Sequence, residues 1–106
     1  MDPDVKVSDA PDRGETSEVF LAASEDGPVV LSWVDFRSGT RCCYAVSEDG
    51  GAVWGPKSCL QPLNGGITGD ATVGVDDAGN FYRVCQDYGQ GQVRISSSTD
   101  GGKTWS

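Results

Sequence analysis

One octapeptide pattern that carries a carboxylate occurs twice in the chain, as SEDGGAVW at residues 47–54 and STDGGKTW at residues 98–105. A carboxylate in a tight turn can accept several backbone N–H hydrogen bonds, and a serine hydroxyl can cap the same turn. Glycines permit left-handed backbone, and a tryptophan can cover the base of the hairpin. The pattern predicts two structurally stapled turns, with a catalytic or calcium role as the alternative. The residues assigned the structural role are Ser47, Asp49, Gly51, Trp54, Ser98, Asp100, Gly102 and Trp105.

Short β-strands must position these turns. No segment of ten or more residues keeps a helical period, and short β-branched and aromatic runs alternate with clusters of Gly, Asp, Asn and Pro. A shift of 51 residues, from Ser47 to Ser98, also superposes most of the first half of the chain on the second. We predict an all-β fold with strands near residues 4–8, 18–24, 28–35, 40–47, 57–61, 70–76, 80–86 and 91–98.

The repeated motif closely resembles the Asp-box, or bacterial neuraminidase repeat, of sialidase-like β-propellers. In that family the box lies between the third and fourth strands of a four-stranded blade, on the rim away from the central cleft. The resemblance implies that residues 1–106 form one unit of two blades, strand-shifted at the termini. Blade one would span about residues 17–62 and blade two about residues 69–106. The strand near residues 4–8 would complete blade two, with another copy of the chain as one source.

Resemblance to sialidases also implies a set of catalytic groups, namely an arginine triad, a tyrosine nucleophile assisted by a glutamate, and an aspartate acid/base. The Arg-Ile-Pro signature is absent, only five arginines occur, and no tyrosine matches the nucleophile's context. We therefore assign no catalytic residue. Asp35 and Arg37, and the corresponding Asp87 and Tyr88, fall on loops that could face the central cavity. These four residues are the candidates for ligand contact, with local loop-closing ion pairs as the alternative.

These observations favour a non-catalytic propeller fragment or a self-assembling two-blade module, with a scaffold or carbohydrate-binding role. The alternative is a part of an exo-sialidase or related glycoside hydrolase whose catalytic residues lie on other blades. Two blades do not close a ring, so we expect either the remaining blades of a parent protein or a homo-oligomer. A trimer with six blades is favoured, and a glycan is a candidate ligand.

Composition argues against several other classes of function. The formal net charge is −8, with 8 Lys and Arg against 16 Asp and Glu, which opposes binding to nucleic acid and to anionic membranes. The chain has no histidine and no Cys-x-x-Cys motif, so a zinc site has few ligands to use. We expect no metal and no cofactor.

The four cysteines favour an oxidising compartment, and hence a secreted or extracellular protein, although this chain shows no signal peptide. If residues 47 and 54 face each other and pairing continues outward in step, Cys42 lies opposite Cys59. A Cys42–Cys59 disulfide is therefore one expectation. The other is that all four cysteines are reduced and buried as small apolar side chains.

Overall fold

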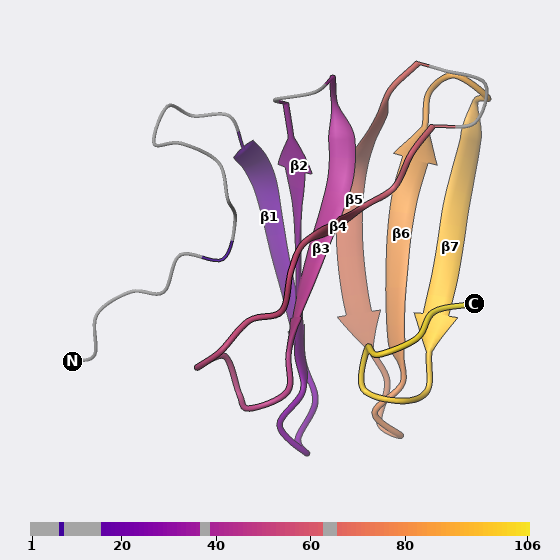
Figure 1. Cartoon of the computed structure of the whole chain (residues 1–106). Helices are drawn as coiled ribbons and strands as arrows, with labels where there is room; N and C mark the ends of the chain where they lie inside the picture. Colours follow the sequence, from indigo (N-terminus) through magenta and orange to yellow (C-terminus); the bar gives the residue numbers. More distant parts are fainter. Residues whose placement is uncertain (1–6, 8–15, 37–38, 63–65) are drawn as a thin grey trace.

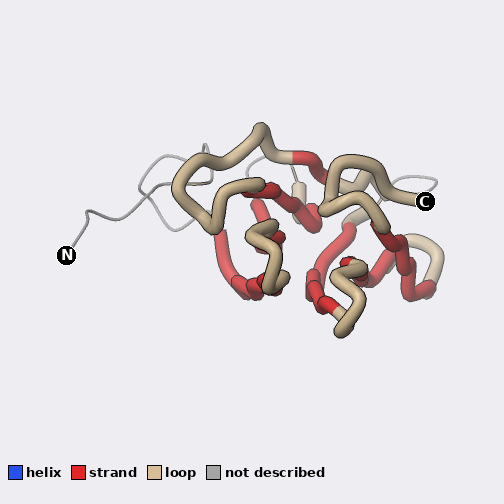
Figure 2. The backbone as a smooth tube through the Cα atoms, turned by 90° about the horizontal axis from the view of Figure 1, so that it is seen from below, coloured by secondary structure: helices blue, strands red, loops and turns tan. Residues whose placement is uncertain are grey.

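The computed structural model describes residues 7, 16–36, 39–62 and 66–106, and this part of the chain forms two antiparallel β-sheets without a helix. No helix long and apolar enough to cross a membrane is therefore found among these residues. The predicted all-β class is confirmed. Figures 1 and 2 show the two sheets standing side by side, with their strands running in similar directions.

Blade one has four strands in the order β1-β2-β3-β4, with the bounds β1 (Thr16–Ala23), β2 (Val29–Asp35), β3 (Arg41–Ser47) and β4 (Ser58–Cys59). Blade two has three strands among the described residues, β5 (Thr68–Val75), β6 (Phe81–Asp87) and β7 (Gln92–Ser98). Each of these strands overlaps a predicted segment. The remaining prediction, residues 4–8, lies outside the described residues except for Val7, which packs against the buried cluster of Trp33, Cys43 and Ala45.

Among the described residues, two buried clusters lie between the two blades, because alternate residues of a strand point to opposite faces of its sheet. A third cluster, of Trp33, Cys43 and Ala45, lies on the other face of blade one. Val30 and Val34 of β2 and Tyr44 of β3 face blade two, which contributes Phe81 and Cys85 of β6. All five side chains are at most 3% exposed. Burial of this apolar surface, at about 25 cal/mol per Å² removed from water, stabilises the contact between the two sheets.

The outer edges of the two blades differ. In blade one, the Gly55 amide donates to Val46 O at 2.9 Å, and the chain continues into β4 beside β3. In blade two, Ser106 and Ser97 make the equivalent contact through two backbone hydrogen bonds of 2.9 and 3.2 Å. Among the described residues, no strand continues along β7 beyond this pair.

Two disulfides correct the cysteine predictions. Cys43, not Cys42, bonds Cys59, and Cys42 bonds Cys85 of blade two, so the expectation of four reduced cysteines is also wrong. The predicted register fails because two residues lie between Gly55 and Ser58 while only one lies between their partners, Val46 and Tyr44. This extra residue in the segment before β4 moves Cys59 one position along β3.

Candidate functional site

The motif turns, residues 47–54 and 98–105, have nearly identical hydrogen bonds. Ser47 Oγ accepts from the Gly51 amide at 2.8 Å and donates to Asp49 Oδ1 at 2.8 Å. The same carboxylate oxygen accepts from the Val53 amide at 2.9 Å, and Trp54 Nε1 donates to Gly51 O at 2.9 Å. Each turn thereby satisfies its own backbone donors over a span of only four residues.

The second motif turn repeats this pattern. Ser98 Oγ accepts from the Gly102 amide at 2.9 Å, and Asp100 Oδ1 accepts from the Thr104 amide at 2.9 Å. The hydroxyl of Thr104 adds a bond of 2.5 Å to Asp100 Oδ2. These donors, Thr104 first, hold the pKa of Asp100 well below its usual range, and the Val53 amide is the main cause of the lowered pKa of Asp49. Both carboxylates are thus committed to their turns.

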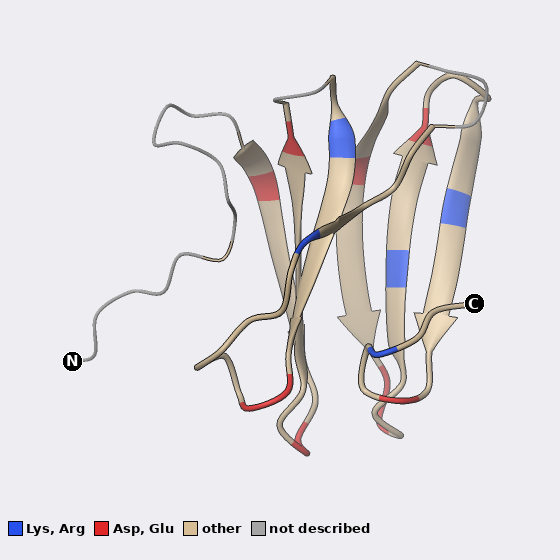
Figure 3. Ribbon diagram, in the orientation of Figure 1, with Lys and Arg blue, Asp and Glu red and all other residues tan. Residues whose placement is uncertain are grey.

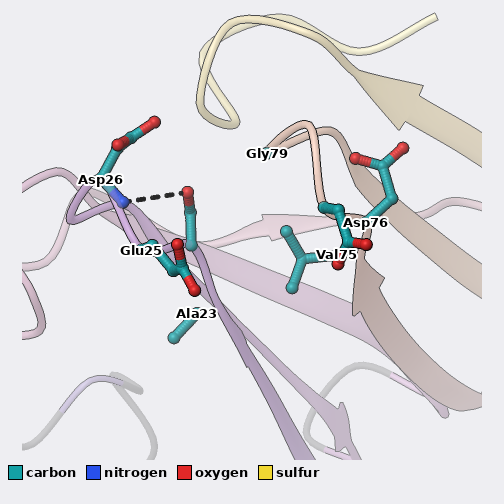
Figure 4. Close-up of a pocket in the computed structure, with 8 residues that line it drawn as sticks. Ala23, Glu25, Asp26, Val75, Asp76 and Gly79 are labelled. Atoms are coloured by element: carbon teal, nitrogen blue, oxygen red, sulfur yellow. Dashed lines mark hydrogen bonds between the residues drawn. The ribbon is translucent and has the colours of Figure 1, made fainter.

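Acidic turns gather at one end of both sheets, shown at the bottom of Figure 3. A cavity of about 410 Å³ lies there between the β1–β2 and β5–β6 turns and is lined by Glu25, Asp26, Asp76 and Asp77 (Figure 4). The Asp76 carboxylate closes its own turn by accepting from the Asn80 amide and the Tyr82 hydroxyl, both at 2.9 Å. No group of three or more residues suited to hold a metal ion occurs in the described part of the chain.

Asp35 and Asp87, two of the predicted ligand-facing residues, end β2 and β6 at the opposite end of the sheets and are buried. The carboxylate of Asp35 lies 3.4 Å from Lys57 Nζ and accepts a 3.5 Å bond from the Trp33 indole. Asp87 lies 3.3 Å from Arg94 Nη1. Each ion pair joins the end of a strand to another segment of the same blade, Lys57 just before β4 and Arg94 within β7. The predicted contact residue Arg37 lies outside the described residues.

Tyr88, the fourth predicted contact residue, is 49% exposed and interacts with two carboxylates that are not among the predicted site residues. Its hydroxyl donates to Asp70 Oδ2, and this bond is the main cause of the raised pKa of Tyr88. Burial comes next, followed by the charges of Asp70 and Glu18. We call Glu18, Asp70 and Tyr88 the rim cluster. Its exposed ring and carboxylate acceptors suit hydrogen bonding to a polyhydroxylated ligand.

Glu18 and Asp70 occupy equivalent positions in the first strand of each blade. Each lies within a register irregularity, between Ser17 and Phe20 in β1 and between Gly69 and Thr72 in β5. Their φ angles are 54° and 53°, in the left-handed region that side chains with a Cβ rarely adopt. The irregularity changes the direction of one carboxylate side chain in each blade, Glu18 in blade one and Asp70 in blade two. The signal that could have found them is the repeat itself, which aligns the segment beginning at Glu18 with the one beginning at Asp70.

Each of the three arginines that the structure describes bridges separate parts of the fold. Arg83 of β6 lies over the rings of Tyr44 and Trp105, with its guanidinium carbon 5.1 and 4.5 Å from their centroids. Arg94 Nη1 donates to Gln61 O at 2.7 Å, across to blade one. Arg41 Nη1 donates to Thr40 O at 2.9 Å and to Gly66 O at 3.2 Å. These guanidinium groups hold the two blades and their connection together.

Comparison with known proteins identifies the fold and no closer relationship. No protein-family model and no curated protein matches the chain. Among solved structures, the chain is similar to Hadza microbial sialidase Hz136, with a TM-score of 0.68 and 18% sequence identity over 87% of this chain and 25% of that one. At this identity the likeness concerns the fold alone. The chain therefore has a sialidase-like all-β fold and spans about a quarter of the length of that sialidase.

Proposed function

We propose that this chain is a non-catalytic two-blade section of a sialidase-like propeller with a scaffold role, and that its motif turns act as Asp-boxes. The observation that carries the proposal is the engagement of its arginines between blades. Recognition of an anionic sugar relies on charge-assisted, bidentate guanidinium bonds to a carboxylate. Arg83 and Arg94 instead contact Tyr44, Trp105, Asp87 and Gln61 within the fold.

Hydrolysis of a fluorogenic sialoside tests the absence of catalysis. At high protein concentration we expect the purified chain to release the fluorophore no faster than buffer does. The Tyr88→Phe and Asp70→Asn variants control for a contaminating hydrolase, because they remove the exposed hydroxyl–carboxylate pair and leave Arg83 and Arg94 in place. Activity that survives purification and is lost in both variants would overturn the non-catalytic assignment.

A carbohydrate-binding role at the rim cluster is supported by Tyr88 and its hydrogen bond to Asp70. Aromatic rings bind the apolar face of sugars, while carboxylates accept hydrogen bonds from sugar hydroxyls. Titration of neutral and sialylated oligosaccharides, followed by NMR, tests this role. The net charge of −8 and the carboxylates of the cluster favour neutral sugars over sialylated ones. We expect shifts at Tyr88 and Asp70 that Tyr88→Ala removes, and unchanged spectra would contradict sugar binding.

The second candidate function is a part of an exo-sialidase or related glycoside hydrolase whose catalytic residues lie on other blades. It is supported by the extent of the structural match, which covers 87% of this chain but only 25% of the sialidase. The genomic reading frame around the chain distinguishes the two candidates. Flanking blades that bear an Arg-Ile-Pro segment and further arginines would favour the enzyme. The two disulfides support secretion into an oxidising compartment in either case.

A further inference from the structure

The two sheets expose apolar side chains on parts of the faces that point away from each other, while Trp33, Cys43 and Ala45 on the outer face of blade one are already buried. On blade one, Leu21 lies opposite Leu31 in the β1–β2 register and is 59% exposed, and the nearby Val19 is 61% exposed. On blade two, the neighbouring β7 residues Val93 and Ile95 are 61% and 67% exposed. Exposed apolar side chains that cluster on a sheet face mark a surface that packs against another protein surface.

The repeat makes these two outer faces correspond to the two sides of the interface inside the chain. Blade one meets blade two through Val30 and Tyr44, and the residues at the equivalent strand positions on the outer face of blade two are Tyr82 and Ile95. Leu21 in turn occupies the position equivalent to Val73, which packs on the core between the blades. The outer face of blade two therefore corresponds to the face of blade one that packs on blade two. The outer face of blade one corresponds to the face of blade two that packs on blade one.

The tryptophans of the motif turns show the same relationship. Trp105 packs into the interface between the blades, against the cluster of Val30 and Phe81. Close to it, Gly102 approaches Val46 so closely that an added Cβ would lie 3.0 Å from both Val46 methyl groups. Trp54, the equivalent of Trp105, instead packs on the outer face of blade one, beside Leu31 and Trp33. A blade placed against that face would bury Trp54 as blade one buries Trp105.

We propose that copies of this chain associate head to tail, with the outer face of blade two of one copy packing on the outer face of blade one of the next. This inference rests on the blade arrangement and holds whether the rim cluster binds a sugar or not. A head-to-tail contact uses two different surfaces, so it either closes into a ring or continues as a filament. Three copies give six blades, and this closed trimer is the assembly we expect.

Sedimentation velocity on the purified, oxidised chain tests association. We expect a species of three times the chain mass of 11.1 kDa at micromolar concentration. A chain that stays monomeric would overturn the proposal and would assign the two faces to further blades of a longer polypeptide. Sialoside hydrolysis and sugar titration report on the proposed function separately, because neither uses Leu21 or Ile95.

Two charge variants test the head-to-tail arrangement itself. Leu21→Glu places a charge in the contact face of blade one, and Ile95→Glu places one in the contact face of blade two. Each variant alone should weaken association by about tenfold or more. Both side chains are mostly exposed, so we expect each variant monomer to keep its fold, which circular dichroism checks. Phe36→Glu is the control, because Phe36 is 46% exposed in the segment after β2 rather than on either face.

Mixing the two variants distinguishes head-to-tail from face-to-same-face association. Ile95→Glu retains an intact blade-one face, and Leu21→Glu retains an intact blade-two face. An equimolar mixture should therefore form a species of twice the chain mass and nothing larger, although each variant alone is monomeric. If Ile95→Glu abolishes association while Leu21→Glu does not, or if the mixture stays monomeric, the head-to-tail interface is wrong.

Discussion

The disulfide between Cys42 and Cys85 joins β3 of blade one to β6 of blade two, across a sequence separation of 43 residues. The second disulfide, Cys43–Cys59, spans only 16 residues and stays within blade one. Because Cys42 and Cys43 are adjacent in a strand, they face opposite sides of the sheet and serve different purposes. One bridge couples the blades, and the other anchors the short strand β4.

We expect the Cys42→Ala/Cys85→Ala variant to be less stable than the Cys43→Ala/Cys59→Ala variant. Loop-closure entropy predicts losses of about 4 and about 3 kcal/mol for the longer and shorter loops. Urea unfolding of the two double variants measures both values. A larger loss for the shorter bridge would show that strand anchoring outweighs the coupling of the blades.

Arg83 should be the most important charged residue of the interface. Its guanidinium group lies over both Tyr44 and Trp105 and donates to Ser96 Oγ at 2.7 Å. We expect Arg83→Ala to reduce the free energy of unfolding by about 1–3 kcal/mol, because stacking, packing and the hydrogen bond are all lost. Arg83→Lys keeps the charge but not the planar group and should recover only part of this loss. Equal stability of the Ala variant and the wild-type chain would contradict the stacking role.

The Tyr88–Asp70 hydrogen bond should be visible in tyrosine titration. The carboxylate of Asp70 stabilises the protonated phenol, which raises the pKa of Tyr88, while burial raises the pKa of Tyr44 to about 12. We expect Asp70→Asn to lower the pKa of Tyr88 toward its ordinary value of about 10. NMR titration resolves the three tyrosines. Asp76→Asn is the matched control, since it should lower the pKa of Tyr82 instead.

The motif turns and the strand positions could be predicted because each depends on residues close together in the sequence. The motif turns are held by bonds between residues at most four positions apart, such as Asp49 to the Val53 amide. Strand positions follow equally from the alternation of β-branched runs with turn residues. Asp35 and Asp87 were expected on loops but are the buried last residues of β2 and β6, and this burial depends on partners from other segments, Lys57 before β4 and Arg94 of β7.

Features that depend on one residue of register could not be predicted. The extra residue between Gly55 and Ser58 places Cys59 opposite Cys43 rather than Cys42. Cys42 instead forms its disulfide with Cys85 on the other blade. The rim cluster depends on register in the same way. Glu18 and Asp70 lie together with Tyr88 only because irregularities in β1 and β5 turn their backbones to positive φ. A glycine at position 18 or 70 would have indicated a positive φ, but these positions hold Glu18 and Asp70.

Acid should weaken the motif turns. The pKa of Asp100 in the folded chain is depressed below its unfolded value of about 3.9, so its contribution to stability is present above that pH. The contribution is lost as pH falls toward the depressed pKa. Asp100→Asn lacks this contribution, so we expect the difference in unfolding free energy between wild type and variant to shrink as pH decreases below about 4. Thermal unfolding across this range measures it. Asp77→Asn, at an exposed position of the β5–β6 turn, serves as the control.

The outer edge of β7 should become protected when the chain associates. The amide of Ser97 points toward Ser106 on this edge, so the amides of Ile95 and Val93, two and four residues away, point in the same direction. A strand donated by residues 4–8 of a neighbouring copy would pair with them, as β4 pairs with Cys43 and Tyr44 in blade one.

We expect slow hydrogen exchange at Val93 and Ile95 in the associated chain and fast exchange after deletion of residues 1–8. The amide of Ser97 is the internal control, because its bond to Ser106 lies outside the deleted segment. Fast exchange at Val93 and Ile95 in the intact assembly would rule out strand donation while leaving the head-to-tail contact between blade faces in place.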